Sequence, residues 1–203
     1  MDWIIDEAAL AAIYGTPGGP SIAKEVPRLT PAYRRLIEAS PFLVLASSGP
    51  AGLDCSPRGD APGCVRVADE STLMIPDRRG NNRTDSLRNL LRDPRVALLF
   101  FVPGMDETLR VNGRARLSCD AALCSSFAID GKAPRSVIVV AIETVFFQCA
   151  RALVRGHLWD PARRVARAAL PSGGAMLAEA SAGREGGAAY DEALPERLRT
   201  TLY

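Results

Sequence analysis

One stretch, residues 72–113, constrains the fold of this chain more than any other part of the sequence. It reads TLMIPDRRGNNRTDSLRNLLRDPRVALLFFVPGMDETLRVNG and changes its apolar period several times. Alternating apolar residues are typical of strands, and apolar residues three and four positions apart are typical of a helix. In order, the pattern predicts a strand at 71–77, a polar loop, a helix at 84–92, and strands at 95–104 and 107–120.

The rest of the chain adds more strands in hairpin order and few helices. Thr30 is placed to cap a helix that has Pro31 at its first position. Turn residues at Gly49–Gly52 join two apolar runs into a hairpin. The further predicted strands are 41–48, 53–60, 64–70 and 136–150, and the further predicted helices are 2–14, 30–39 and 120–129.

This order predicts a mainly β (α+β) fold: a six- to seven-stranded antiparallel barrel with peripheral helices. A doubly wound sheet needs a helix between most strands, and that spacing is missing. We expect residues 1–40 to form a helical extension, 41–160 the barrel, and 161–203 a helical or flexible extension. Within the last part, 171–189 is rich in Gly, Ala and Ser, which predicts a mobile or loosely packed segment.

Two strands carry more detailed predictions. The strand at 95–104 is nearly all apolar, so we expect it to be central and covered on both faces. Asn112-Gly113 has the composition of a tight hairpin turn, but strand-like alternation continues after it. We therefore predict a β-bulge at this position.

Composition describes an ordinary globular protein of 203 residues, with 47% apolar and 24% charged residues. The net charge of +2 is too small to argue for nucleic acid or a membrane surface. No apolar segment follows a basic start, so we expect no signal peptide and a cytoplasmic protein with reduced thiols. Five irregularly spaced cysteines and one histidine match no metal-site spacing, so no metal is expected.

The polar loop before the predicted helix at 84–92 is a candidate phosphate site. Arg79, Arg83 and Arg88 lie close to Asn82 and Ser86 in the sequence. Unpaired N–H groups at a helix start favour an anion, and arginine adds charge-assisted hydrogen bonds. The open alternative is a plain helix cap, made by Asn82 or Thr84, with solvated arginines.

A second candidate is Arg58 with Gly59, in the sequence SPRGD. Glycine permits close approach of the backbone to a planar ring. The alternative is a simple turn after a strand. We expect His157 and Trp159, which follow the last strand, to be a surface histidine and a packed tryptophan.

A family resemblance covers about 42–149. It rests on the order of two short motifs, DPRV at 93–96 and VNGRA at 111–115. Together with SPRGDAPG at 56–63, they resemble the pyridoxamine 5′-phosphate oxidase-like family of FMN-binding split barrels. The match is to an uncharacterised subgroup more than to the vitamin B6 enzymes. The Arg-x-His pattern expected near the end of those enzymes is not found, and the chain ends PERLRTTLY.

The resemblance implies a homodimer with FMN at its interface and a set of contact residues. It places the basic Arg66 near the phosphate, with Arg83 and Ser86 as further phosphate ligands. It gives Ile75, Pro76 and Asp77 backbone and side-chain contacts along the flavin. It places Thr108, with Arg110 two residues on, near the flavin ring.

The function implied is an FMN-dependent oxidoreductase acting on an unidentified small molecule, with NAD(P)H as one candidate electron donor. A flavin performs its own redox chemistry, so the missing triad or carboxylate pair is no objection. A deazaflavin in place of FMN stays open. So does the alternative of a non-catalytic flavin- or haem-binding carrier or sensor, because fold does not fix function.

Overall fold

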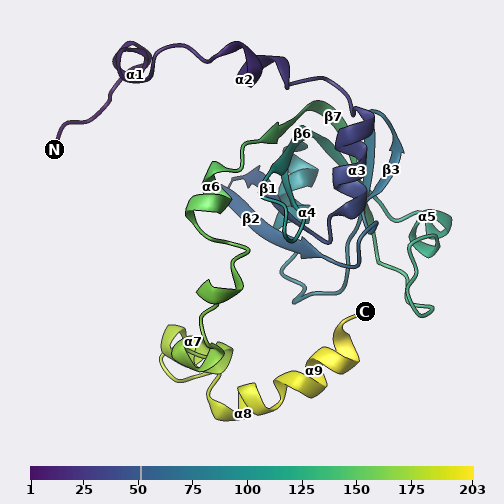
Figure 1. The fold of residues 1–203 in the computed structure, drawn as a ribbon. Helices are drawn as coiled ribbons and strands as arrows, with labels where there is room; N and C mark the ends of the chain where they lie inside the picture. Colours follow the sequence, from purple (N-terminus) through teal and green to yellow (C-terminus); the bar gives the residue numbers. More distant parts are fainter. Residues whose placement is uncertain (51) are drawn as a thin grey trace.

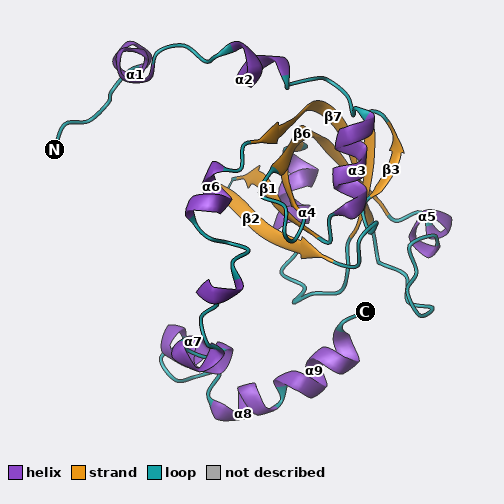
Figure 2. Cartoon of the chain, viewed as in Figure 1, coloured by secondary structure: helices purple, strands orange, loops and turns teal. Residues whose placement is uncertain are grey.

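The computed structural model describes residues 1–50 and 52–203, and a single seven-stranded antiparallel sheet organises them (Figures 1 and 2). The strand order across the sheet is β2-β1-β5-β6-β7-β4-β3. The predicted antiparallel fold with peripheral helices is therefore confirmed, with seven strands. Their bounds are Phe42–Gly49 (β1), Gly52–Gly59 (β2), Arg66–Asp69 (β3), Thr72–Pro76 (β4), Arg95–Phe101 (β5), Thr108–Ser118 (β6) and Val137–Gln148 (β7).

The sheet curls around one apolar core because alternate residues of each strand point to the same face. Leu45, Leu98 and Val111 come from three different strands, and each is at most 1% exposed. The sheet is open, with β2 and β3 as its two edges. The predicted turn at Gly49–Gly52 includes Ala51, which lies outside the described residues; Gly49 and Gly52 themselves pair across the β1–β2 hairpin.

Nine α-helices surround or extend from the sheet in the described residues. Helix α3 packs on β3 and β6, α4 packs on β1, β2 and β6, and Cys124 of α5 packs with Val137 of β7. The helices are Glu7–Tyr14 (α1), Gly19–Ala23 (α2), Pro31–Ala39 (α3), Asp85–Arg92 (α4), Ala121–Ser125 (α5), Arg151–Arg155 (α6), Gly173–Ala180 (α7), Ala188–Glu192 (α8) and Leu194–Thr201 (α9).

The helix starts follow their capping residues. Thr30 caps α3 as predicted, because its side chain accepts a hydrogen bond from the Tyr33 amide at 3.2 Å. The prediction that the first helix begins at residue 2 is wrong. Asp6 accepts from the Ala9 amide at 2.8 Å, and this cap starts α1 at Glu7.

The prediction that the apolar strand at 95–104 is covered on both faces is wrong for the single chain. On β5, Val96, Leu98 and Phe100 are buried in the core. The alternate residues, including Leu99 and Phe101, are only half-buried. An antiparallel sheet curled around one core has one inner face, so an apolar strand leaves its second face outward.

The predicted bulge in β6 is confirmed. The register between β6 and β7 shifts between Asn112 and Gly113. Gly113 is required here because a Cβ at this position would lie 2.1 Å from the carbonyl oxygen of Ala141.

The two ends of the chain extend from the barrel (Figure 1). Helices α1 and α2 contain no buried residue. The segment at 171–189, predicted to be mobile or loosely packed, contains α7 and the first two residues of α8, and Gly174 is its one buried residue. Alanine favours helix, and the Gly174 amide donates to Asp191 at 2.8 Å, which joins the two helices.

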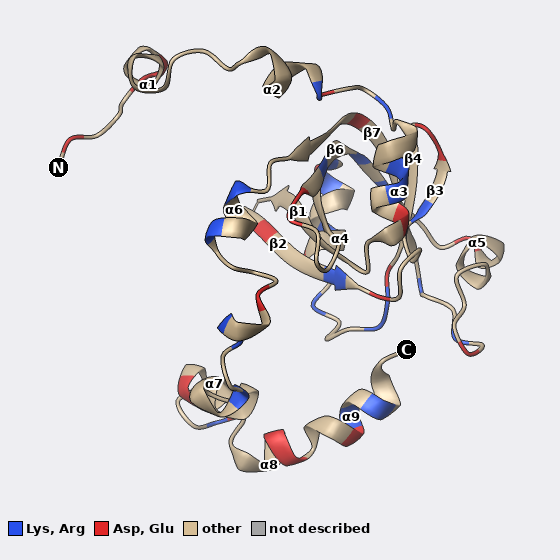
Figure 3. Cartoon of the chain, in the orientation of Figure 1, with Lys and Arg blue, Asp and Glu red and all other residues tan. Residues whose placement is uncertain are grey.

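Charged residues of both signs are spread along the chain (Figure 3). Among the described residues, no helix has the length and apolar character needed to cross a bilayer. Within the same residues, no three His, Cys, Asp or Glu side chains are grouped as metal ligands. The five cysteines are all free.

Candidate functional site

A cavity of about 680 Å³ lies where β2, the loop after β4, the start of α4 and residues 132–135 meet. Its size falls within the range of about 300–1,000 Å³ for small-molecule sites. Basic side chains dominate its wall. They are Arg58, Arg78, Arg79, Arg83, Lys132 and Arg135, against the acidic Asp54, Asp77 and Asp85.

Strand β2 supplies one wall because its alternate residues share a face. Asp54, Ser56 and Arg58 all line the cavity. They pair with Ser47, Leu45 and Leu43 of β1, which are on the core side of the sheet. The period of two along DCSPR places these polar groups together, at an edge strand where the core gives way to the cavity.

Helix α4 points its N-terminus at the cavity, and no side chain among the described residues caps it. Thr84 stands at the N-cap position with φ of 57°, in the left-handed region, and its hydroxyl bonds no helix amide. Asn82 also has a positive φ, of 60°, and is exposed. The alternative in which Thr84 or Asn82 simply caps the helix is therefore not what the structure shows. The first-turn N–H groups are left for another acceptor.

Two of the predicted phosphate ligands already have protein partners. Ser86 is 3% exposed, and its hydroxyl donates to Asp54 Oδ2 at 2.5 Å and lies 2.8 Å from Ser56 Oγ. Arg83 pairs with Asp85 at 2.8 Å, and its side chain is 75% exposed. Ser86 thus fixes α4 on β2, while the Arg83 side chain is paired with Asp85 and lies mostly in solvent beside the cavity.

Arg58 is the most constrained basic group of the cavity. Its guanidinium forms an ion pair with Asp77. Its Nε is buried and has no hydrogen-bond partner among the described residues. A buried donor without a partner is costly, so this atom marks a place where a ligand acceptor would be stabilising.

Asp60, Arg78 and Tyr203 form a hydrogen-bonded group beside the cavity. Arg78 Nε donates to Asp60 Oδ2 at 2.6 Å, and the Tyr203 hydroxyl donates to Asp60 Oδ1 at 2.7 Å. Burial alone raises the pKa of Asp60, but hydrogen bonds from Tyr203, the Ala61 amide and Arg78 outweigh it and lower that pKa. The hydrogen bond to Asp60 raises the pKa of Tyr203.

This group was not predicted from the sequence. Asp60 could have been included among the candidate residues, because Asp60 directly follows Gly59 in the SPRGD motif. For Tyr203 no sequence signal was available, since it lies 143 residues from its partner and follows a segment with no motif.

The ten predicted site residues divide into three sets. Arg58, Asp77, Asn82, Arg83 and Ser86 line the main cavity. Ile75 and Pro76 line a neighbouring cavity of about 200 Å³, which shares Arg58 with the first. The three that line neither are Arg66, Thr108 and Arg110.

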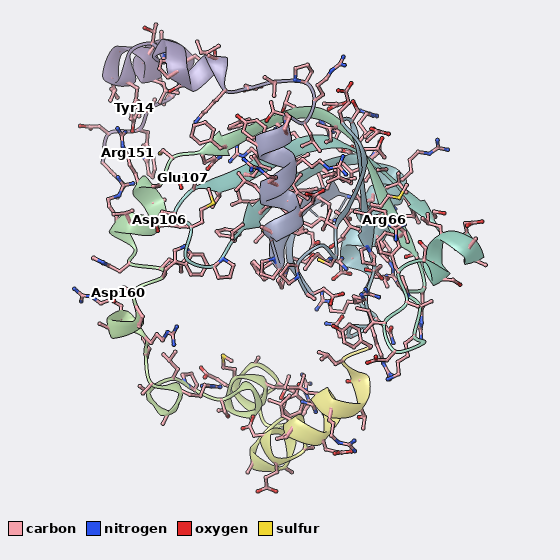
Figure 4. The ribbon with its side chains drawn as sticks, turned by 45° about the vertical axis from the view of Figure 1, so that its right-hand side comes forward. Tyr14, Arg66, Asp106, Glu107, Arg151 and Asp160 are labelled. Atoms are coloured by element: carbon pink, nitrogen blue, oxygen red, sulfur yellow. The ribbon has the colours of Figure 1, made fainter. Side chains whose placement is uncertain are left out.

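Arg66 is occupied elsewhere. It donates to the hydroxyl and carbonyl oxygens of Ser126, both at 3.0 Å, and stacks 3.9 Å from the Phe127 ring centroid. Figure 4 shows Arg66 on the opposite side of the barrel from Glu107, which precedes Thr108. Within one chain these predicted contacts do not meet.

The residues after β7 match the expected surface histidine and packed tryptophan. His157 is exposed. Trp159 is half-buried and donates from Nε1 to the Met105 carbonyl at 2.8 Å. This bond fixes the chain that leaves the barrel against the β5–β6 turn.

The model of the pyridoxamine 5′-phosphate oxidase family matches residues 29–149, more than half of the chain. The matched region holds all seven strands and α4. The chain belongs to the pyridoxamine 5′-phosphate oxidase family. The family resemblance predicted from the sequence is thus confirmed, and the matched region contains the DPRV and VNGRA motifs.

Three solved structures are similar to part of this chain. HupZ of Group A Streptococcus is 16% identical, with 59% of this chain and 93% of that chain covered and a TM-score of 0.48. A Lactobacillus delbrueckii protein provisionally named a pyridoxamine 5′-phosphate oxidase is 23% identical, with 60% and 95% covered and a TM-score of 0.47. An F420 reductase is 17% identical, with 59% and 98% covered and a TM-score of 0.43. No curated protein sequence matches the chain. The family assignment therefore rests on the sequence match.

Proposed function

We propose that this chain binds FMN in the main cavity and acts as a flavin-dependent oxidoreductase on a small molecule. One observation carries the proposal: the uncapped N-terminus of α4 and the unpaired Nε of Arg58 line the same cavity. Both groups are donors that need an acceptor. Membership in a flavin-binding family supplies the acceptor, a phosphate and a ring system rich in oxygen and nitrogen.

The charges of the cavity fit a phosphate. Six basic side chains face three acidic ones. Asp77 is paired with Arg58 and Asp85 with Arg83, while Asp54 accepts from Ser86. An anion near the α4 N-terminus would be stabilised by the helix dipole and by arginines that can reorient toward it. Arg79 and Arg83 would hold the phosphate, and Arg58 would donate to the flavin side of the ligand.

A bound flavin supplies the electron-transfer chemistry, and the chain supplies position and electrostatics. Arg58 and Asp77 fix each other, so the donor at Arg58 is held in place before a ligand arrives. Pro76, which is buried, and Pro57 add apolar walls to the neighbouring cavity. NAD(P)H is a candidate electron donor.

We also propose a homodimer formed through the outer face of β1 and β5. Phe42 pairs with Phe101, Val44 with Leu99, and Ala46 with Ala97, so these apolar side chains share one face. Phe42 is 40% exposed, and its ring centroid lies 6.0 Å from that of Phe101. A contiguous apolar face of this kind marks an interaction surface. Arg110 is opposite Leu99 on the same face, so it would contribute at the interface.

The absorption spectrum of the purified protein tests the cofactor. We expect flavin bands, with one FMN per chain, or the same bands after incubation with FMN and removal of the excess. Mass spectrometry of the released cofactor distinguishes FMN from a deazaflavin. A preparation that stays colourless after FMN addition would contradict the proposal.

Turnover with NADPH or NADH and a panel of electron acceptors tests the activity. Reduction of bound flavin followed by its reoxidation through an acceptor supports the oxidoreductase. Bound flavin with no turnover supports a carrier or sensor instead. For the dimer, light scattering should give twice the chain mass of 21.7 kDa, and Leu99→Glu should give one chain mass.

A further inference from the structure

The C-terminal segment, residues 172–203, is joined to the barrel by a single hydrogen bond among those of the described residues. This bond runs from the Tyr203 hydroxyl to Asp60. The other hydrogen bonds of the segment lie within α7, α8, α9 and their turns. Figure 1 shows the segment leaving the barrel after α6 and returning toward it at the C-terminus.

The receiving site for Tyr203 is rigid. The Asp60 side chain is 3% exposed and the Arg78 side chain 16% exposed, and the two form an ion pair. Arg78 also donates to the Phe127 carbonyl at 2.8 Å. Its guanidinium lies 5.6 Å from the centroid of the Tyr203 ring. Asp60 and Arg78 are therefore held by contacts besides those with Tyr203.

The position of Tyr203 gives this contact a consequence for the cavity. Tyr203 is one of the residues that line the main cavity, together with Arg58 and Arg83. No other residue of 172–203 lines this cavity, so Tyr203 is the segment's one contribution to the wall. Its removal would enlarge the opening on that side.

We propose that Tyr203 is a latch: it docks on Asp60 and Arg78, holds residues 172–203 against the barrel, and forms a removable wall of the ligand cavity. Release of the latch opens the cavity to solvent and permits exchange of its contents. The identity of the ligand rests on the proposed function, but the docking of Tyr203 does not.

The docking is tested without any ligand. In Tyr203→Phe the ring remains and only the donor to Asp60 is lost. We expect the ¹⁵N order parameters of the α9 amides to fall from about 0.85, typical of a rigid backbone, to below about 0.6. Tyr190→Phe is the matched control, because Tyr190 lies in the same segment and its hydroxyl makes no hydrogen bond among the described residues. Unchanged α9 order parameters in Tyr203→Phe would overturn the latch.

The effect on the cavity is tested with FMN as the probe. The FMN-loaded protein is diluted into a large volume of buffer, and flavin fluorescence reports the release of FMN. The hydrogen bond joins the charged acceptor Asp60 to the hydroxyl of the half-buried Tyr203. Its loss predicts FMN release about fivefold faster in Tyr203→Phe, with Tyr190→Phe unchanged. Mobile α9 with an unchanged release rate would refute the role of Tyr203 as a wall. If the wild-type protein binds no FMN and Tyr203→Phe still frees α9, the docking stands and the FMN assignment fails.

Discussion

Arg58 and Asp77 form an ion pair across the open side of the barrel. Arg58 belongs to β2, at one edge of the sheet, and Asp77 directly follows β4. Four strands, β1, β5, β6 and β7, separate β2 from β4 in the sheet order. The contact therefore shows that the sheet curls until its two sides meet, and it places a basic donor at the point where they do.

The ion pair should couple the two sides energetically. The side chains of Arg58 and Asp77 are 22% and 18% exposed. Breaking such a pair leaves a poorly solvated charge, so Arg58→Ala should lower the free energy of unfolding by about 1–2 kcal/mol, below the 3–5 kcal/mol of a fully buried pair. Urea unfolding measures this change. A double-mutant cycle with Asp77→Ala should give a coupling of at least about 0.5 kcal/mol, and a coupling of zero would refute the link across the barrel.

FMN affinity should depend more on Arg58 than on Arg83. Arg58 is mostly buried with a free donor, whereas the Arg83 side chain is 75% exposed and screened by solvent. Loss of a charge-assisted hydrogen bond from the mostly buried Arg58 predicts that Arg58→Ala increases the Kd for FMN about tenfold. Solvent screening weakens the contribution of Arg83, so Arg83→Ala should increase this Kd about threefold. Fluorescence titration with FMN measures both. Arg28→Ala, which breaks an exposed pair with Glu70 away from the cavity, is the control and should leave Kd unchanged.

Gly113→Ala should destabilise the barrel at the β6 bulge. The added Cβ would lie 2.1 Å from the Ala141 carbonyl oxygen, a backbone atom that can move only with β7. Overpacking of this kind predicts a loss of about 2–3 kcal/mol in the free energy of unfolding. Gly19→Ala in α2 is the control, because its Cβ would meet nothing within 4 Å. Equal unfolding curves for the two variants would contradict the predicted clash.

Acid should weaken the fold through Asp60. Its pKa in the folded chain lies below the ordinary value of 3.8. Its contribution to stability is therefore complete above about that pH and is lost as pH falls through the lower, folded value. Urea unfolding between pH 6 and pH 2.5 should show this loss in the wild type. Asp60→Asn should be less stable at pH 6 and should show a smaller loss on acidification; an identical pH dependence would refute the assignment to Asp60.

Much of the fold could be predicted from local sequence. Thr30 and Pro31 predicted the start of α3 because a cap needs only neighbouring backbone groups. Alternation around Asn112 and Gly113 predicted a strand with a bulge, and the structure has one. The start of α1 was predicted too early, because apolar spacing alone did not reveal that Asp6 acts as the cap.

The candidate site was predicted only where its residues belong to one local pattern. The SPRGD strand, the loop before α4 and the first turn of α4 supplied five residues that line the cavity. Arg66 resembled a phosphate ligand by position, but its contacts with Ser126 and Phe127 depend on where α5 packs. Burial of β5 was overestimated because composition reports that a strand is apolar, not which face a single core covers.

The sequence by itself determined the strands, the helix after the arginine-rich loop and the family, because these depend on residue spacing within short segments. Tertiary structure alone decided that Arg58 meets Asp77 and that Tyr203 meets Asp60. These pairs are separated by 19 and 143 residues, and the contacts exist only because the sheet curls and the C-terminal segment returns. No local pattern encodes the path of a chain over such distances, since that path is set by the packing of one shared core.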